Sequence, residues 1–93
     1  MDCADYISYV LSARRRYDVL QKLSNNDYTA RELADETLIS YQYTVIKLQE
    51  LCDHGLVTHN NVKRGKIYSI TPLGRSVINR IVHKNHTGYK RGV

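Results

Sequence analysis

The side chains best suited to chemistry in this sequence are cations and amides, which recognise anions and base edges rather than transform a substrate. Lys63, Arg64 and Lys66 lie within four residues of one another, and clustered cations of this kind bind phosphate oxygens. Gln42 and Lys47 carry amide and ammonium groups, which hydrogen-bond the edges of bases in the major groove. These residues favour nucleic-acid binding if the fold brings them onto one surface.

Residues for catalysis or metal binding do not gather in the same way. The sequence contains no nucleophile–base–acid set, phosphate-binding glycine loop or paired-carboxylate motif, so we expect no enzyme and no catalytic residue. A loose metal-like cluster comprises Cys52, Asp53, His54 and His59. Zinc sites need tightly spaced ligand pairs, and the helical count turns Cys52 toward the core and His54 away from it. We therefore expect a free thiol at Cys52, with no metal and no cofactor.

Charge is distributed unevenly along the 93 residues, a length that predicts one domain over 1–93. Residues 1–53 have a net charge of −3, whereas residues 54–93 have eight basic residues and no acidic one. This asymmetry indicates a polyanionic partner, although a solvated basic surface is the simpler alternative. No apolar run approaches a membrane span, and the N-terminus does not resemble a secretory signal. We expect a cytoplasmic protein without membrane contact.

Local signals predict the elements that would position the recognition residues. Apolar spacing over 6–23 predicts one bent helix, or a short helix followed by a longer one that Ser12 caps. Thr29 and Glu32 form a capping box that opens the next helix. Ser40 caps a third helix over 41–54, and Gly55 ends it in the left-handed conformation. Two helices joined by a tight turn make a helix-turn-helix.

The third helix has two faces when successive residues are placed 100° apart. The core-facing side comprises Tyr41, Thr44, Val45, Leu48, Leu51 and Cys52. The solvent-facing side comprises Gln42, Tyr43, Ile46, Lys47 and Glu50.

Residues after Gly55 change from helical to alternating spacing. Segments 56–60 and 67–70 predict two strands, joined by a polar turn over 61–66 with Gly65 at positive φ. Thr71 and Pro72 then predict the start of a last helix that runs to about residue 83. The basic tail, residues 86–93, is expected to be flexible.

This order, and in particular Ser40–Leu51, Gly55–Val57 and Gly65–Gly74, resembles MarR/ArsR-like winged-helix regulators, with small archaeal and archaeal-virus regulators similar in size. The resemblance covers about 12–82. It implies an α+β, mostly helical fold: a winged helix-turn-helix with a two-stranded β-hairpin wing. It also implies a transcriptional regulator that binds double-stranded DNA sequence-specifically, with recognition helix 41–54 in the major groove. Wing 61–66 would contact the backbone or the minor groove.

The same resemblance indicates which functions to discount. The helix before the recognition helix lacks the cysteine pair of metal-sensing ArsR proteins, and the terminal helices are short for an effector pocket. A small-molecule effector is therefore not expected. Two alternatives remain open: a winged-helix protein-interaction module, and an RNA-binding protein whose eight tyrosines stack on bases.

The residues predicted to contact DNA lie at the start of the second helix, on the recognition helix and on the wing. They are Thr29, Arg31, Ser40, Tyr41, Gln42, Tyr43, Lys47, Lys63, Arg64 and Lys66. Of these, Thr29 and Arg31 would bind a phosphate at a helix N-terminus, and Arg64 would enter a narrow minor groove.

The terminal helices predict a homodimer, because they carry more apolar residues than a small core readily covers. The expected interface comprises Tyr6, Tyr9, Val77, Ile78, Ile81 and Val82. Two-fold pairing would place two recognition helices about 34 Å apart, as a palindromic site requires. A monomer whose last helix packs wholly on its own core is the alternative.

Overall fold

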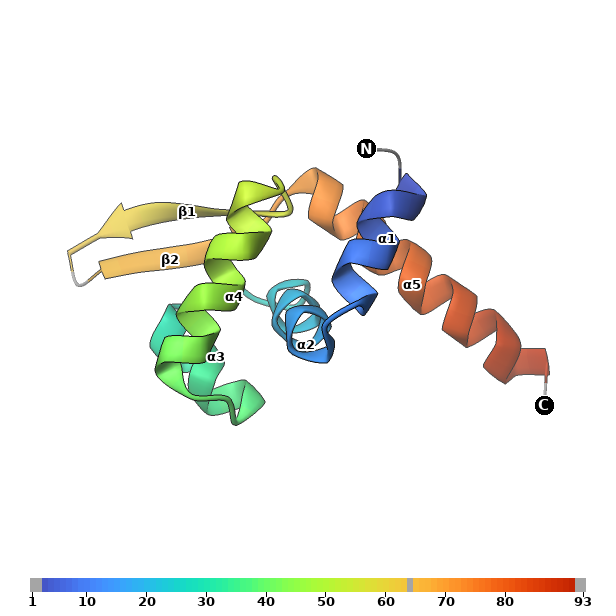
Figure 1. The fold of residues 1–93 in the computed structure, drawn as a ribbon, viewed down its shortest axis with the longest axis horizontal. Helices are drawn as coiled ribbons and strands as arrows, with labels where there is room; N and C mark the ends of the chain where they lie inside the picture. Colours follow the sequence, from blue (N-terminus) through green and yellow to red (C-terminus); the bar gives the residue numbers. More distant parts are fainter. Residues whose placement is uncertain (1–2, 64, 92–93) are drawn as a thin grey trace.

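The computed structural model describes the backbone of residues 3–63 and 65–91, and the side chains of residues 4–63 and 65–82. The elements in chain order are α1 (Cys3–Leu11), α2 (Arg14–Leu23), α3 (Ala30–Thr37), α4 (Tyr41–Asp53), β1 (Val57–Val62), β2 (Gly65–Ile70) and α5 (Pro72–Arg91). Figure 1 shows α2 in the middle of the molecule, with the β1–β2 hairpin at one end and α5 toward the other. This is the mostly helical α+β arrangement with a hairpin wing that the sequence predicts.

The N-terminal segment forms two helices, which settles the alternative left open by the sequence. The break falls at Ser12 and Ala13, but Ala13 is the N-cap of α2 and makes no side-chain capping bond. The Ser12 hydroxyl instead donates to the Tyr9 carbonyl at 2.8 Å. The expectation that Ser12 caps α2 is therefore wrong, because its hydroxyl binds back to the end of α1.

The helix-turn-helix forms as the local signals predict. The Glu32 amide donates to the Thr29 hydroxyl at 3.1 Å, and the Glu32 carboxylate accepts from the Thr29 amide at 2.9 Å. Ser40 accepts the Tyr43 amide at 3.2 Å and starts α4, and Gly55 follows α4 with a φ of 74°. The turn between α3 and α4 contains one feature that the sequence did not predict. Leu38 adopts a left-handed φ of 59° and is 90% exposed.

The core surrounds α2, which contacts each of the other four helices. Its fully buried side chains are Val10, Val19, Leu20, Leu33, Leu48, Leu51, Leu56 and Val77. Each such side chain stabilises the fold by about 1.5–3 kcal/mol relative to exposure. They come from all five helices and from the start of the hairpin, so one core holds the recognition helix and the wing together.

The wing is longer than predicted and its turn is shorter. The strands pair antiparallel from Val57↔Ile70 to Val62↔Gly65, so the first two and the last two residues of the turn expected over 61–66 belong to the strands. Gly65 has a φ of 128°, as expected for its place beside the turn. The base of the wing is tied to the loop before α3, because Tyr28 and Tyr68 exchange backbone hydrogen bonds of 2.8 and 3.2 Å.

The last helix begins at Pro72 as predicted, and the Thr71 hydroxyl accepts the Gly74 amide at 3.0 Å. It runs to Arg91 rather than to about residue 83. The predicted flexibility of tail 86–93 is not tested, because its side chains and residues 92–93 lie outside the described residues. In the part of the chain that the structure describes, no helix is long and apolar enough to cross a bilayer.

The apolar stripe of α5 is not the exposed interface that we expected. Val77, Ile78 and Ile81 are buried within the protomer, where α1 packs against α5. Tyr6 and Tyr9 on α1 are half-buried against the same core. Of the α5 residues named for dimerisation, Val82 is exposed. The expectation is wrong for the three buried residues because elements of the same protomer that pack on α5, namely α1, α2 and β2, leave them inaccessible to a second copy.

Candidate nucleic-acid interface

The exposed surface of α4 is a stripe of amide and apolar side chains. Gln42, Ile46 and Gln49 are all exposed and are spaced by four and three residues, so they share one helical face. Tyr43 lies beside them and is also exposed. The Gln49 amide donates to the Asp53 carboxylate at 2.9 Å, at the end of the helix. The exposure predicted for Gln42, Tyr43 and Ile46 is thus confirmed.

Lys47 does not belong to this exposed surface, contrary to prediction. The residue is 8% exposed, and its Nζ lies 3.1 and 3.3 Å from the two carboxylate oxygens of Glu50. The same Nζ lies 5.0 Å from the centre of the Tyr43 ring. The helical count places Lys47 toward solvent, but a long side chain at the edge of a face turns toward an available partner.

Glu50 also binds a second cation, which comes from α2. The Arg16 guanidinium lies 3.1 Å from the Glu50 carboxylate and stacks over the Tyr9 ring at 3.8 Å. The Tyr9 hydroxyl donates to the Glu50 backbone carbonyl at 3.3 Å. These contacts join α1, α2 and α4, and so restrict the rotation of α4 about its own axis. We call Tyr9, Arg16, Lys47 and Glu50 the α4 clamp.

The charge state of Glu50 follows from these contacts. Burial alone would raise the pKa of its carboxyl group, but hydrogen bonds from Lys47 and Arg16 and the charges of both outweigh burial and lower the pKa. Glu50 is therefore ionised in neutral solution, and its single negative charge is shared by the two cations of the clamp. Lys47 offers no free charge to a ligand in this arrangement.

His54 lies next to the clamp rather than pointing away from the protein as predicted. Its ring stacks on Tyr9 with 3.8 Å between ring centres, and its Nδ1 lies 3.0 Å from the Glu50 carbonyl. The neighbouring Cys52 is half-buried, and burial, followed by the charge of Asp53, raises the pKa of its thiol. Among the side chains of residues 4–63 and 65–82, no three His, Cys, Asp or Glu residues group as metal ligands.

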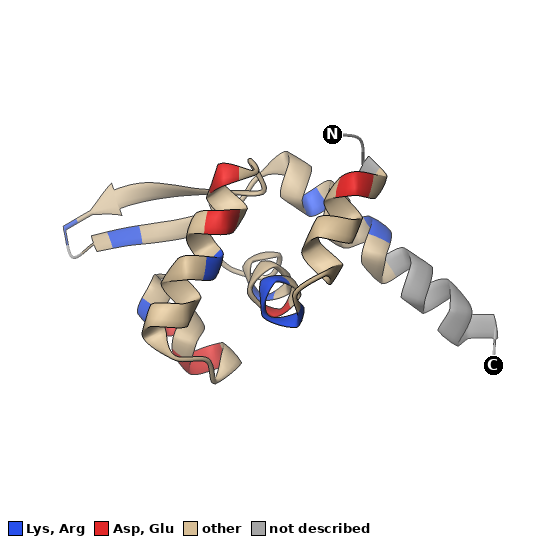
Figure 2. Cartoon of the chain, in the orientation of Figure 1, with Lys and Arg blue, Asp and Glu red and all other residues tan. Residues whose placement is uncertain are grey.

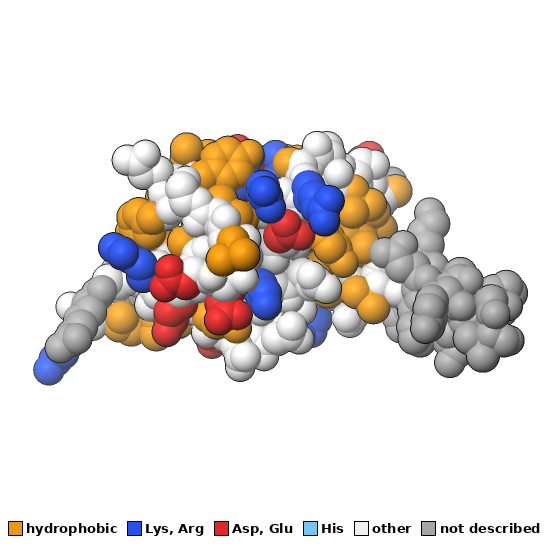
Figure 3. Space-filling view, turned by 90° about the horizontal axis from the view of Figure 1, so that it is seen from below, with side chains coloured by type: hydrophobic (Ala, Val, Ile, Leu, Met, Phe, Trp, Pro, Cys, Tyr) orange, Lys and Arg blue, Asp and Glu red, His pale blue; other side chains and the backbone are white. Residues whose placement is uncertain are grey.

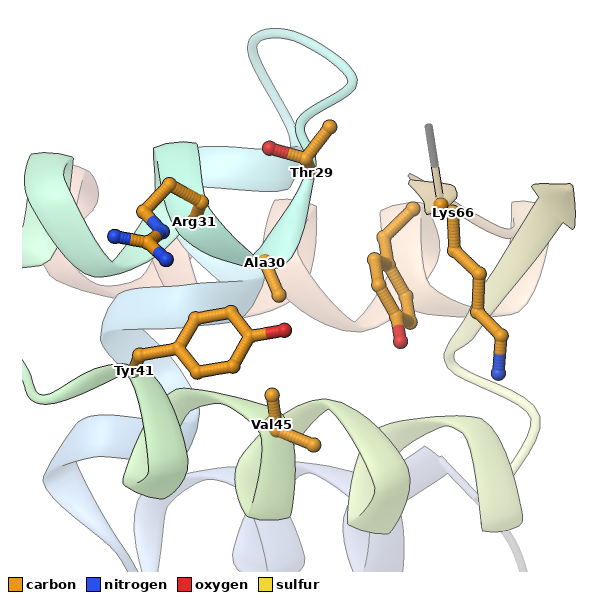
Figure 4. Close-up of a pocket in the computed structure, with 8 residues that line it drawn as sticks. Thr29, Ala30, Arg31, Tyr41, Val45 and Lys66 are labelled. Atoms are coloured by element: carbon orange, nitrogen blue, oxygen red, sulfur yellow. The ribbon is translucent and has the colours of Figure 1, made fainter. Parts of the chain in front are cut away.

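A groove of about 520 Å³ separates the helix-turn-helix from the wing (Figure 4). Its lining comprises Thr29, Ala30, Arg31, Tyr41, Val45, Gly65, Lys66 and Tyr68. Arg31 and Lys66 stand on opposite sides in Figure 4, and Tyr41 lies on the same side as Arg31. The Arg31 guanidinium lies 5.2 Å from the centre of the Tyr41 ring. The groove therefore has cationic edges and an aromatic wall.

The helix N-terminus beside this groove is already occupied by a side chain of the protein. The Thr29 hydroxyl and the Glu32 carboxylate satisfy each other's backbone amides in the capping box. A phosphate at this end would meet the negative charge of Glu32. The phosphate contacts predicted for Thr29 and Arg31 stay predictions, and the Arg31 side chain is exposed.

The described cations of the basic half, which lie within 54–63 and 65–82, are divided between two regions of the fold. Lys63 and Lys66 are exposed on the wing, whereas Arg75 and Arg80 are exposed on α5. Figure 2 shows the wing and α5 cations at separate ends of the molecule. Figure 3, which views the protein from below, shows hydrophobic, acidic and basic side chains interspersed. Arg64 lies outside the described residues, so its predicted minor-groove contact is not tested.

Sequence reasoning missed the structural role of Arg16, one of three consecutive arginines. The signal was available in the spacing. Arg16 precedes the buried residues Val19, Leu20 and Leu23 by three, four and seven positions, so it lies on the inner face of α2. An arginine on an inner face needs an acidic partner, and Glu50 is that partner.

The comparison with solved structures identifies the fold. No protein-family model and no curated protein matches this chain in sequence. TubR bound to 24 bp of tubC, from Bacillus thuringiensis serovar israelensis pBtoxis, superposes with a TM-score of 0.83 at 18% identity, covering 90% of this chain and 96% of TubR. An ArsR-like transcriptional regulator from Rhodococcus sp. RHA1 gives 0.66 at 25% identity, covering 89% and 78%.

A MarR family transcription regulator gives a TM-score of 0.76 at 25% identity. The match covers 84% of this chain and 56% of the regulator, so the chain spans little more than half of that protein. The narrower resemblance to archaeal or archaeal-virus regulators stays a prediction. The chain has the winged helix-turn-helix fold of MarR-family and ArsR-like regulators.

Proposed function

We propose that this protein is a transcriptional regulator that binds double-stranded DNA sequence-specifically. The observation that carries the proposal is the exposed stripe of α4, flanked by the cations of the groove. An α-helix is about 10–12 Å wide and the major groove is about 12 Å wide, so α4 fits there with its stripe against base edges. Arg31 and Lys66 would then face the phosphates on either side. Structural neighbours include TubR in complex with DNA.

The site residues divide into three groups under this proposal. Gln42 and Tyr43 would read bases. Phosphates would be bound by Arg31, Tyr41, Lys63 and Lys66, and by Arg64 if it points to the DNA. The hydroxyl groups of Thr29 and Ser40 already accept a helix amide, so each would bind a DNA phosphate only by donating its hydroxyl proton. We no longer propose base contact for Lys47, because its ammonium is buried in the α4 clamp.

We also propose that the protein acts as a homodimer, which is typical of MarR-family regulators. A two-fold axis would let two copies of α4 bind a palindromic site. The buried residues Val77, Ile78 and Ile81 cannot form the interface without unfolding the core. We therefore place the contact around Tyr6 and the exposed Val82.

The remaining functional expectations form part of the same proposal. The chain would act as one domain over 1–93, without enzymatic activity, cofactor or small-molecule effector. A regulator must reach its DNA, so we place the protein in the cytoplasm. Of the neighbours described above, the MarR-family and ArsR-like proteins are transcription regulators and TubR is bound to DNA, which supports the non-enzymatic part.

Selection of bound duplexes from a random library, followed by gel-shift titration, tests the proposal. We expect an enriched palindrome, two protomers per duplex, and an affinity that falls by orders of magnitude between low and moderate salt. Gln42→Ala should reduce the preference for the selected site over random DNA. Gln21→Ala, an exposed glutamine on α2, is the matched control and should leave it unchanged.

Four outcomes would contradict the proposal. One is the absence of any enriched sequence, and another is an affinity that does not change with salt. Preference for single-stranded RNA over duplex DNA would favour the RNA-binding alternative, and binding to neither would favour a protein-interaction module.

A further inference from the structure

The surface of α4 that would face the bases carries no available cation. Lys47 is the one basic residue in the helix, as Figure 2 shows, and both carboxylate oxygens of Glu50 hold its ammonium. The exposed stripe instead consists of Gln42, Ile46 and Gln49. This composition restricts which bases the helix can recognise.

Each base offers a different partner in the major groove. Guanine is read by arginine or lysine, and cytosine by a carboxylate. Adenine is read by the amide of glutamine or asparagine, and the thymine methyl group is read by apolar side chains. On the stripe, the carboxylate of Asp53 lies at the far end of α4 and already accepts the Gln49 amide. The first half of the stripe, Gln42 and Ile46, therefore presents the preferred partners of adenine and thymine.

Ile46 is the second observation, because it is an apolar side chain that is 52% exposed at the centre of the stripe. Its aliphatic surface would lose contact with water against a thymine methyl group, which is favourable. Gln42 lies one helical turn earlier on the same face, where its amide can make two hydrogen bonds to an adjacent adenine.

We propose that the stripe of Gln42 and Ile46 reads A·T base pairs, and that the half-site bound by α4 is rich in them. This inference rests on the proposed DNA-binding function. Arg31 and Lys66 lie at the edges of the groove rather than on the stripe, so they contribute affinity for phosphates without selecting guanine. The clamp maintains this selectivity by keeping Lys47 away from the bases.

Replacing thymine by uracil tests the role of Ile46, because it removes only the methyl group. In duplexes selected by the wild-type protein, uracil at the half-site should weaken binding about four-fold for each contacted methyl group. Ile46→Ala should bind the two duplexes within about two-fold of each other. Leu11→Ala is the matched control, since Leu11 is also 52% exposed but lies on α1; it should keep the full sensitivity to uracil.

Replacing adenine by 7-deazaadenine tests Gln42 in the same way, because it removes the N7 acceptor. Wild-type affinity should fall, and the affinity of Gln42→Ala should not. A selected half-site rich in G·C pairs, or equal wild-type binding to thymine and uracil duplexes, would overturn the inference while leaving DNA binding intact. Failure to bind any duplex would instead overturn the proposed function together with the inference.

Discussion

The recognition helix and the wing contain the same kind of cation but use it differently. Lys47 on α4 is buried and paired with Glu50, whereas Lys63 and Lys66 on the wing are exposed. A buried and compensated lysine stabilises the protein, and an exposed lysine is available to a phosphate. The comparison indicates that α4 determines the sequence preference, whereas the wing contributes affinity for DNA phosphates.

Breaking the α4 clamp should have the largest effect among these predictions, and the effect should be on the free energy of unfolding. Glu50→Ala leaves Arg16 and Lys47 largely buried without their shared carboxylate, so we expect the free energy of unfolding to fall by about 2–3 kcal/mol. Urea denaturation measures it. Glu36→Ala is the control, because its pair with Lys22 is well exposed and should change stability by under about 1 kcal/mol. Equal losses in the two variants would show that the clamp is an ordinary surface interaction.

The clamp also makes stability depend on pH in a definite direction. The pKa of Glu50 is lower in the folded protein than its usual value of 4.5. Its contribution is therefore fully present above pH 4.5 and is lost as pH falls through the folded-state pKa. Unfolding measured from pH 6 down to pH 3, approximate limits spanning the carboxyl range, should show this loss. Glu50→Gln should lose less stability over that interval, and an unchanged slope would contradict the argument.

The wing should govern affinity for all DNA sequences alike. Replacing Lys63 and Lys66 together by alanine should weaken binding to selected and random duplexes about equally, by roughly ten-fold at moderate salt, and lower the salt slope by about two. Gel-shift titrations at several salt concentrations measure both quantities. Arg80→Ala provides the control, since Arg80 is an exposed cation of the same basic half on α5. A similar change in slope for Arg80→Ala would undermine the assignment to the wing.

Lys47 should behave unlike the wing lysines. Lys47→Met keeps the aliphatic volume and removes one partner of Glu50, so we expect a loss of about 1 kcal/mol in unfolding free energy. Because its ammonium is buried and held by Glu50, the salt slope of DNA binding should not change. If the slope falls by about one, Lys47 leaves the clamp on binding and contacts a phosphate.

The smallest effect is expected in the turn that precedes α4. Leu38 has a left-handed backbone that is costly for leucine, and its side chain is exposed. Leu38→Asn should raise the unfolding free energy by about 0.5–1 kcal/mol, because asparagine adopts this conformation more readily. Leu11→Asn, an exposed leucine within α1, should give no gain. A Leu38 variant that is less stable would mean that the leucine makes contacts that offset the strain.

Local features of this fold could be predicted from the sequence because each depends on neighbouring residues. The capping box of Thr29 and Glu32, the cap at Ser40 and the left-handed Gly55 involve spacings of a few residues. The exposure of Gln42 and Ile46 follows from helical periodicity in the same way. The wing was recognised, although its strands extend closer to the turn than composition suggested.

Features that depend on distant residues could not be predicted in this way. The ion pair between Arg16 and Glu50 joins positions 34 residues apart, and helical periodicity cannot predict a contact at that separation. The apolar face of α5 was predicted correctly from its spacing. The spacing did not predict that other elements of the same protomer would bury Ile81. Periodicity identifies the face of a helix, whereas the partner of that face is a property of the whole chain.

The backbone bridge between Tyr28 and Tyr68 has a consequence for the entropy of binding. A two-stranded hairpin on its own is marginally ordered in water, but this bridge connects the base of the wing to the loop that leads into α3. The bridge fixes the position of the wing relative to the helix-turn-helix in the free protein. The two parts therefore lose little conformational freedom when they bind a ligand together. Part of the ordering cost of association is thereby removed before encounter, which favours tighter binding for the same set of contacts.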